Sequence, residues 1–412
     1  MKIKLGVFFG GKSVEHEVSI ITAIQAIENM NKEKYEIIPI YIAKNNKMYC
    51  GELVGDIRNY KDINNLIANS TQVTLAQKDD KVVLLKCNKK LFEDAVYNSI
   101  DIAFPIVHGT NVEDGTLQGY LKMFNLPYVG CDVTSSAVGM DKYVCKCLLK
   151  ENNIPTLDCR WYTSKDYNDG VEHIMDDVEK NIEYPVIIKP ANLGSSVGIE
   201  IAKDRNALQE AVENAFTYAK KIVIERAIKN LKEVNCSVIG DYEDAMPSEC
   251  EEPVKKDEIL SFSDKYLSGG SKKGGKLGGK LGESGQSSMN AGVLKLPADI
   301  TKEQRQTIQD LAVKTFKTLG CTGVIRIDFM IDQDSGEILV NEVNTIPGSL
   351  SFHLWRATNL AYTDMLDKII DLALKRNREE SNMTFSFDSN ILAGYYENGF
   401  GGTKGIKGTK QI

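Results

Sequence analysis

Four polar side chains with the types and spacing for metal and phosphate chemistry occur in "GVIRIDFMIDQDSGEILVNEVNT", residues 323–345. Two runs of alternating apolar and polar residues flank an Asp-Ser-Gly turn, a pattern typical of a β-hairpin. Because side chains alternate across a strand, Arg326 and Asp328 are expected to share one face. On the partner strand, Glu342 and Asn344 share a face in the same way. The pattern therefore predicts an arginine, two carboxylates and an amide on one side of the hairpin.

The other side of both runs is apolar and is expected to face the core. Its residues are Ile325, Ile327, Phe329 and Ile331 on the first run, and Leu339 and Val343 on the second. Carboxylate and amide oxygens suit Mg²⁺, which proteins usually hold with one or two carboxylates plus substrate phosphates. A salt bridge on a solvated hairpin would better explain an isolated pair. The Pro-Gly turn of the following "NTIPGSLS" favours the metal and phosphate site, because it can direct backbone N–H groups to the same place.

A second candidate site is the glycine- and serine-rich loop of "IIKPANLGSSVGI". Lys189 ends a buried strand, and the loop from Gly194 through Ser195 to Ser196 follows within reach. Backbone N–H groups and hydroxyls in such a loop can hold phosphate. The spacing matches neither a Walker A motif nor a dinucleotide-binding fingerprint. Taken alone, the loop is better explained as an ordinary hairpin turn.

Two further candidates lie nearer the N-terminus. In "FFGGKSVEHEVS" a glycine turn precedes a helix, which is a natural place for an anion but also a common structural turn. The helix dipole explains Glu17 in the first turn, whereas Glu15 calls for a further reason. His108 ends a strand at a Gly-Thr turn, where open α/β sheets bind ligands, although a single histidine is more often structural.

The elements that position these residues are those of an α/β protein. "KIKLGVFF", a helix from about Val18 to Met30 and "YEIIPIYIA" form the strand–helix–strand pattern of a parallel sheet. A hairpin is expected around Asp79 and Asp80, and "SIDIAFPIVHG" is another buried strand. "DGTLQGYLKMFNLPYVG" predicts a helix and a return strand. Residues 1 to about 130 therefore form one predicted domain.

Two more units are expected after it. The second starts with a helix in "MDKYVCKCLLKENNIP" and has strands on both sides of the Gly/Ser loop. The third begins near "KEVNCSVIGD" and includes a helix from about Lys302 to Leu319 and the hairpin. An amphipathic helix, "AYTDMLDKIIDLALKR", closes it.

Composition excludes several classes of function. The chain has 412 residues, 42% hydrophobic and 26% charged, with a net charge of -7, which argues against a nucleic-acid-binding surface. No segment approaches the roughly 18 apolar residues of a membrane span. The nine cysteines include no CxxC pair, and there are four histidines, so we expect reduced thiols in a cytosol and no His-rich zinc site.

Six motifs together resemble one family. "GGKSVEHEVS", "HGTNVEDGTLQG", "GMDK", "IIKPANLGSSVG", "RIDFM" and "NEVNTIPG" follow the order and spacing of the D-alanine–D-alanine ligases, which are ATP-grasp enzymes. The likeness covers about residues 3 to 376. It implies an N-terminal parallel-sheet domain and two α+β domains that bind ATP between them. The implied boundaries are 1–128, 129–228 and 229–376 with a lid loop at 259–293, followed by a C-terminal extension at 377–412.

The resemblance also implies roles for single residues. For ATP they are Lys142 and Lys189 at the phosphates with Ser195 and Ser196, Glu225 at the adenine hinge, Glu233 at the ribose, and Lys265 reaching the γ-phosphate from the lid. For the metal they are Asp328, Glu342 and Asn344, holding two Mg²⁺ ions, with Mn²⁺ able to substitute. For the amino acids they are Glu15 at the first D-alanine's amino group with Ser195 and Tyr266, His108 near the substrates, and Arg326 and the Gly348 N–H at the oxyanion.

The acceptor segment departs from the family pattern. It reads "PGSLSFHLW" and places His353 and Leu354 where the family usually has a Ser-Leu pair for the second substrate. The lid is longer and richer in glycine than the family's usual one. Composition alone would make residues 266–292 a linker, but Lys265 and Tyr266 directly precede the glycines and indicate a lid. The depsipeptide-forming relatives carry a histidine in the lid, so Tyr266 favours an amine acceptor and a dipeptide product.

The resemblance therefore implies ATP-dependent ligation of two D-alanines through an acyl phosphate, for peptidoglycan precursors. One alternative is a ligase that joins D-alanine to D-serine, D-lactate or another amino acid. Another is a nucleotide-binding regulator without catalysis, which the retained metal and oxyanion residues disfavour. The family likeness also suggests a homodimer in the cytoplasm, with small-molecule substrates and no nucleic-acid partner.

Overall fold

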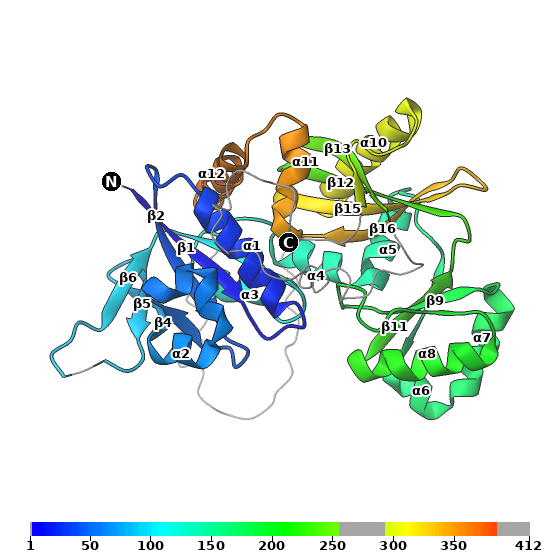
Figure 1. Ribbon diagram of the computed structural model, residues 1–412, viewed down its shortest axis with the longest axis horizontal. Helices are drawn as coiled ribbons and strands as arrows, with labels where there is room; N and C mark the ends of the chain where they lie inside the picture. Colours follow the sequence, from blue (N-terminus) through cyan, green and yellow to red (C-terminus); the bar gives the residue numbers. More distant parts are fainter. Residues whose placement is uncertain (1, 90, 255–292, 385–412) are drawn as a thin grey trace, which may run out of the picture. The chain divides into compact units, whose positions relative to one another are not determined.

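The computed structural model of the chain describes residues 2–89, 91–254 and 293–384, and Figure 1 shows their helices and strands. The chain divides into two units, residues 1–374 and 375–412. The first unit contains all the sheets of the described residues. These sheets lie within residues 3–107, 159–226 and 231–344. The predicted domain boundaries at 128, 228 and 376 remain predictions.

The N-terminal sheet has seven strands in the order β6-β5-β4-β3-β2-β1-β7. Its centre confirms the parallel prediction, since β1 pairs in parallel with β2 and β7, while the other neighbours are antiparallel. The hairpin between β4 and β5 turns at Asp79 and Asp80, as predicted. The prediction of a return strand after residue 123 is wrong, because the structure has there only an isolated bridge between Tyr128 and Ala103. The strands are β1 Ile3–Gly10, β2 Tyr35–Ile42, β3 Met48–Cys50, β4 Thr71–Lys78, β5 Lys81–Lys86, β6 Val96–Ile100 and β7 Ile102–Val107.

Helix α1 packs against the parallel strands β1 and β7. Its buried face includes Ile20, Ala23, Ile24 and Ile27, spaced three and four residues apart as in an amphipathic helix. The helices of this part are α1 His16–Asn29, η1 Glu52–Gly55, η2 Ile57–Lys61, α2 Ile63–Ala68 and α3 Thr116–Met123.

The second sheet is antiparallel, in the order β10-β9-β11-β8. Its apolar face packs against α7 and α8 (Figure 1), with Ile188, Ile222 and Ile224 in a shared core. Lys189 and Glu225 alternate with these residues and therefore lie on the opposite face. The elements are β8 Cys159–Thr163, α6 Ser164–Asp169, α7 Val171–Asn181, β9 Val186–Pro190, β10 Glu200–Ala202, α8 Arg205–Tyr218 and β11 Lys221–Arg226.

The third sheet has the order β14-β13-β12-β15-β16, and its neighbouring strands are antiparallel. Helix α10 covers one face, where the predicted core residues of the hairpin other than Leu339 pack with Ile308, Ala312 and Phe316. A capping box between Thr301 and Gln304 starts that helix. The elements are β12 Leu231–Gly240, β13 Ala245–Val254, β14 Val293–Lys295, α10 Lys302–Thr318, β15 Gly323–Asp332 and β16 Ile338–Asn344.

A β-bulge at Asn341 corrects the predicted faces of the hairpin. Asp328 pairs with Glu342, but the next pair is Phe329 with Val340, so Asn341 is the extra residue. Past the bulge the alternation reverses. Leu339 therefore lies opposite Met330, on the face that carries Asp328, and not on the core face as predicted. Val340 takes the core position instead.

Several helices connect the sheets. Helix α5 contributes Cys145 and Leu149 to the core of the third sheet. No helix in the described part of the chain is long and apolar enough to cross a membrane. The remaining helices are α4 Val133–Met140, α5 Lys142–Glu151, η3 Gly348–Ser351, α11 Phe352–Ala357 and α12 Tyr362–Glu380.

Candidate active site

A row of polar residues crosses the third sheet on the face opposite α10. Glu251 on β13 pairs with Asn235 on β12, Asn235 pairs with Asp328 on β15, and Asp328 pairs with Glu342 on β16. Residues directly opposite each other in antiparallel strands project from the same face. Four strands therefore place three carboxylates and an amide side by side. The hairpin pattern predicted half of this row, and Asn235 and Glu251 were missed.

Arg326 and Asn344 surround the carboxylate of Asp328. Arg326 donates from Nε to Asp328 Oδ1 at 2.6 Å and from Nη2 to Oδ2 at 2.8 Å, which is a bidentate ion pair. Asn344 Nδ2 donates to Asp328 Oδ2 at 3.1 Å. The three side chains are half-buried, so the predicted grouping is present and open enough to meet a ligand.

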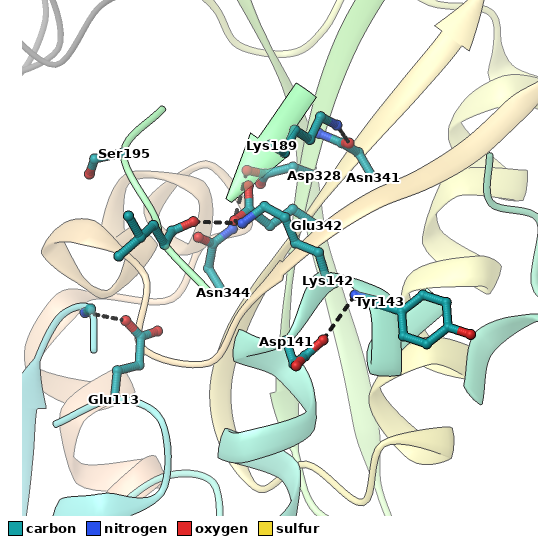
Figure 2. A network of polar contacts seen from close by, with 12 residues as sticks. Glu113, Asp141, Lys142, Tyr143, Lys189, Ser195, Asp328, Asn341, Glu342 and Asn344 are labelled. Carbon is teal, nitrogen blue, oxygen red and sulfur yellow. Dashed lines mark hydrogen bonds and ion pairs between the residues drawn. The ribbon is translucent and has the colours of Figure 1, made fainter. Parts of the chain in front are cut away.

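Lys142 reaches the same place from the start of α5. Asp141 caps this helix by accepting hydrogen bonds from Tyr143 N and Val144 N, which fixes its first turn. Lys142 Nζ donates to Glu342 Oε1 at 2.9 Å and to the Leu193 carbonyl at 2.6 Å. Figure 2 shows Lys142 beside Glu342, Asp328 and Asn344. A buried ammonium thus lies next to the predicted metal ligands and the Gly/Ser loop.

Lys189 and Glu225 form a buried ion pair on the face of the second sheet that is opposite α7 and α8. Lys189 Nζ also donates to Asn341 Oδ1 at 3.0 Å, which the bulge in β16 makes possible (Figure 2). Lys146, which the sequence reasoning missed, lies 2.8 Å from the other oxygen of Glu225. Burial alone raises the pKa of Glu225, but the two lysines more than offset it and bring the pKa to about 2. Glu225 is therefore ionised at neutral pH.

Glu15 meets the Gly/Ser loop, although 180 residues separate it from Ser195. Ser195 Oγ donates to Glu15 Oε1, and a Cβ added to Gly194 would lie 2.7 Å from Glu15 Oε2. Glu15 is buried, and its own N–H is bound by Ser13 Oγ at 3.1 Å. The predicted pairing of Glu15 with Ser195 is present in the structure. Ser196 follows with a positive φ of 59°, as Ser195 does with 54°.

His108 and Glu113 connect the end of β7 to the loop after β16. The His108 N–H donates to Ser19 Oγ at 2.9 Å, and its Nε2 lies 3.1 Å from Thr22 Oγ1. Burial lowers the pKa of His108 to about 4, so its imidazole is neutral at pH 7. Glu113 accepts hydrogen bonds from Gly109 N at 2.9 Å, Ile346 N at 3.0 Å and Thr345 Oγ1 at 3.3 Å.

Glu113 is expected to make folding pH-dependent. Burial raises its pKa to about 8 from 4.5, and the nearby Glu15 adds to the rise. The folded state therefore holds a proton that the unfolded state releases between these two values. The stability is complete below pH 4.5 and is lost as the pH rises through 8, by up to about 1.4 kcal/mol per pH unit. Urea unfolding of the wild type and of Glu113→Gln at pH 5 to 8 measures this. The variant should be less stable, because Gly109 N loses its acceptor, but its slope should be flatter; an unchanged slope contradicts the assignment.

An apolar cluster lies on the same sheet face beyond Asp328. It consists of Leu157, Met330 and Leu339, with Ile228 and Leu231 packed against it. Glu233 is directly opposite Met330 and half-buried. A flat apolar group could therefore rest here beside a carboxylate. The family resemblance pointed to Glu233 in this region. Leu339 was expected on the core face instead, because the bulge in β16 was not predicted.

The segment after β16 turns sharply at Gly348. Ser349, Leu350 and Ser351 have φ values of 51°, 50° and 51°, a left-handed conformation that is costly for residues other than glycine. His353 Nε2 lies 2.6 Å from Glu251 Oε2, so His353 borders the end of the polar row. The Leu354 side chain is fully buried. Glu251 also accepts a hydrogen bond from Asn235 Nδ2 at 3.0 Å.

Asp328, Glu342 and Asn344 fit Mg²⁺ in their chemistry. No group of three or more histidine, cysteine, aspartate or glutamate side chains in the described residues could hold a metal by itself. Mg²⁺ does not require one, because it commonly uses one or two carboxylates and completes its shell with phosphate and water. Lys142 and Arg326 add positive charge at the same carboxylates.

Two predicted site residues, Lys265 and Tyr266, lie outside the described residues, as does nearly all of the predicted lid at 259–293. The missed residues had weak signals. Lys146 follows Lys142 by four residues, which places both on one helix face. Asn341 would have been found only from the bulge.

Two family models match the chain. One, described as "D-ala D-ala ligase N-terminus", matches residues 4–131, and the other, "D-ala D-ala ligase C-terminus", matches residues 148–371. The chain belongs to the D-alanine–D-alanine ligase family. A D-alanine–D-alanine ligase of Thermosipho melanesiensis is 38% identical over 391 residues, covering 95% of this chain and 98% of that ligase.

Solved structures of such ligases share the fold. The VanG D-Ala:D-Ser ligase of Enterococcus faecalis is 31% identical with a TM-score of 0.71, covering 90% of this chain and 100% of that one. The D-alanine–D-alanine ligase of Bacillus anthracis, solved in complex with ATP, is 26% identical with a TM-score of 0.62, covering 92% and 99%. These ligases confirm the predicted family and the ATP-grasp fold.

Proposed function

We propose that this chain joins two D-alanines in an ATP-dependent reaction through an acyl phosphate, and so supplies the dipeptide for peptidoglycan precursors. The observation that carries the proposal is the convergence of Lys142, Arg326, Asp328 and Glu342 on one sheet face, next to the Glu15–Ser195 pair. Cations, oxygen ligands for a metal and an acid for an amino group are the parts that this reaction needs. The family membership supports the same assignment.

The proposed role of each residue follows from the charge or polarity of its side chain. Glu15, which accepts a hydrogen bond from Ser195 Oγ, would bind the ammonium group of the first D-alanine. Lys142 and Lys189 are suited to offset the negative charge of the ATP phosphates. The cluster of Leu157, Met330 and Leu339 with Glu233 fits an adenine ring and its ribose. Asp328, Glu342 and Asn344 would hold Mg²⁺, which would polarise the phosphoryl group under transfer.

Formation of the peptide bond needs an oxyanion stabilised by donors. Arg326 and the Gly348 N–H are the proposed donors. The ion pair with Asp328 holds Arg326 beside the proposed metal ligands. His108 remains neutral beside them and is a candidate neighbour of the substrates. A cytoplasmic location, two metal ions with Mn²⁺ as a substitute, and a homodimer belong to the same proposal on the family likeness.

A second acceptor has one specific observation in its favour. His353, at the end of the polar row, is paired with the buried Glu251, so an imidazole and a carboxylate stand in the predicted acceptor segment. The structural relative VanG is named as a D-Ala:D-Ser ligase. We therefore include D-serine as the alternative acceptor.

The test supplies ATP and Mg²⁺ with D-alanine alone, or with D-alanine plus D-serine, D-lactate or L-amino acids. Phosphate release and the mass of the product are measured. D-alanine alone should give phosphate and a D-Ala-D-Ala product. Phosphate release only when D-serine is present would show that D-serine, and not D-alanine, is the acceptor. Absence of phosphate with every pair would refute the ligase proposal.

A further inference from the structure

Three buried lysines converge around two carboxylates next to the proposed phosphate site. Lys142, Lys146 and Lys189 are 7%, 3% and 6% exposed, and the carboxylates that they contact are Glu225 and Glu342. The group of five therefore carries one surplus positive charge. Burying a charged group without a partner is costly, so a surplus cation in this place indicates a site for an anion.

Glu225 binds its two lysines through different oxygens. Lys189 contacts Oε1 and Lys146 contacts Oε2, so each cation has its own acceptor. The two come from different parts of the fold. Lys189 is a diagonal neighbour of Glu225 within the second sheet, whereas Lys146 projects from α5, which packs into the core of the third sheet.

The two lysines differ in what else they contact. Lys189 donates to Asn341, the bulge residue next to Glu342, and so lies at the edge of the polar row. Lys146 donates to Thr156 Oγ1 at 3.1 Å. Lys189 therefore borders the proposed phosphate site, whereas Lys146 contacts the other oxygen of Glu225, away from that site.

We propose that Lys146 is a positioning residue: it holds the charge of Glu225, so that Lys189 can leave this acid and bind a phosphate of ATP. The inference rests on the proposed ATP-binding function. Glu225 is fully buried and ionised, and it needs at least one cation to stay so. With Lys146 in place, Lys189 is the surplus cation. Without Lys146, Glu225 would retain Lys189 and compete with the phosphate.

The experiment measures ATP binding by calorimetry in wild type, Lys146→Met, Lys146→Arg, Glu225→Gln and the double variant Lys146→Met/Glu225→Gln. Lys146→Met should weaken ATP binding by about tenfold or more, the size of a typical coupling between two sites. Lys146→Arg should bind ATP almost as the wild type does. Glu225→Gln alone carries any loss of the adenine contact, so the double variant is compared with it. In that background Lys146 has no acid to hold, and Lys146→Met should change the ATP affinity little. In kinetics, Lys146→Met should raise the KM for ATP more than it lowers kcat.

Lys150→Met is the matched control, because Lys150 lies one turn further along α5 and pairs with the exposed Asp158. It should leave ATP binding unchanged. Thermal unfolding identifies variants that fail to fold. If Lys146→Met fails to fold, the double variant decides, since an ATP affinity about tenfold weaker than that of Glu225→Gln alone overturns the proposal. Equal binding by wild type and Lys146→Met also overturns it, whereas a wild type that binds no ATP refutes the proposed function instead.

Discussion

Replacing Asp328 with asparagine is expected to abolish measurable ligation. The carboxylate lies between Arg326 and Asn344 in the polar row and is a proposed Mg²⁺ ligand, so the change removes a negative charge from the metal site and one partner of a bidentate pair. Metal ions commonly supply several kcal/mol of transition-state stabilisation, and each 1.36 kcal/mol is a factor of ten. We expect a loss of roughly 10²-fold or more in kcat, measured as phosphate release with D-alanine.

Asp334→Asn is the control for this change. Asp334 lies in the turn of the same hairpin and is exposed, and its carboxylate accepts a hydrogen bond from the Asn230 amide at 3.2 Å. Its activity should equal that of the wild type. Circular dichroism should show both variants folded. If the Asp328→Asn enzyme has the wild-type kcat at saturating Mg²⁺, Asp328 is not a metal ligand.

Glu225→Gln is expected to cost the most stability. The change leaves Lys189 and Lys146 buried without a counter-charge, and breaking a buried ion pair from one side typically costs about 3–5 kcal/mol. Because the folded-state pKa of Glu225 is about 2 and its ordinary value is 4.5, its contribution is fully present above pH 4.5. It is lost as the pH falls toward 2. Urea unfolding at pH 7 and at pH 4 measures both effects.

Glu337→Gln provides the comparison for Glu225. Glu337 is exposed and lies 3.3 Å from Arg226, so its removal should cost less than about 1 kcal/mol. The difference between the two variants should shrink as the pH falls below 4.5, because the unfolded chain then protonates Glu225 and must release that proton to fold. A Glu225→Gln protein as stable as Glu337→Gln would mean that the buried lysines find other partners.

The hairpin shows how far local patterns reach. Alternation correctly placed Arg326, Asp328, Glu342 and Asn344 on one face, because each strand is regular over those residues. It misplaced Leu339, because one extra residue in β16 reverses the faces without a signal in hydrophobicity. A bulge depends on how two strands pair, and the pattern of a single strand does not contain that information.

For the candidate site, too, local sequence patterns identified single residues but not the contacts between distant ones. Motifs and their resemblance to a family pointed to Glu15 and Ser195, but only the folded chain brings together side chains 180 residues apart. The Lys146–Glu225 pair was missed for the same reason, since it joins a helix to a strand of a different sheet. Glu251 lies in a run of acids and has no signal of its own in the sequence, and only strand pairing brings it beside Asn235.

Glu113 also determines how the two halves of the site would behave if the chain were cut between α3 and α4. In the separated N-terminal fragment its carboxyl would lose the contacts to Thr345 and Ile346 and be more exposed to water, and its pKa would fall toward the ordinary value. When the fragments rejoin and Ile346 N and Thr345 Oγ1 bind it again, burial restores the raised pKa. Reassembly would therefore take up a proton, and fragment complementation would be tighter in mild acid than in mild alkali.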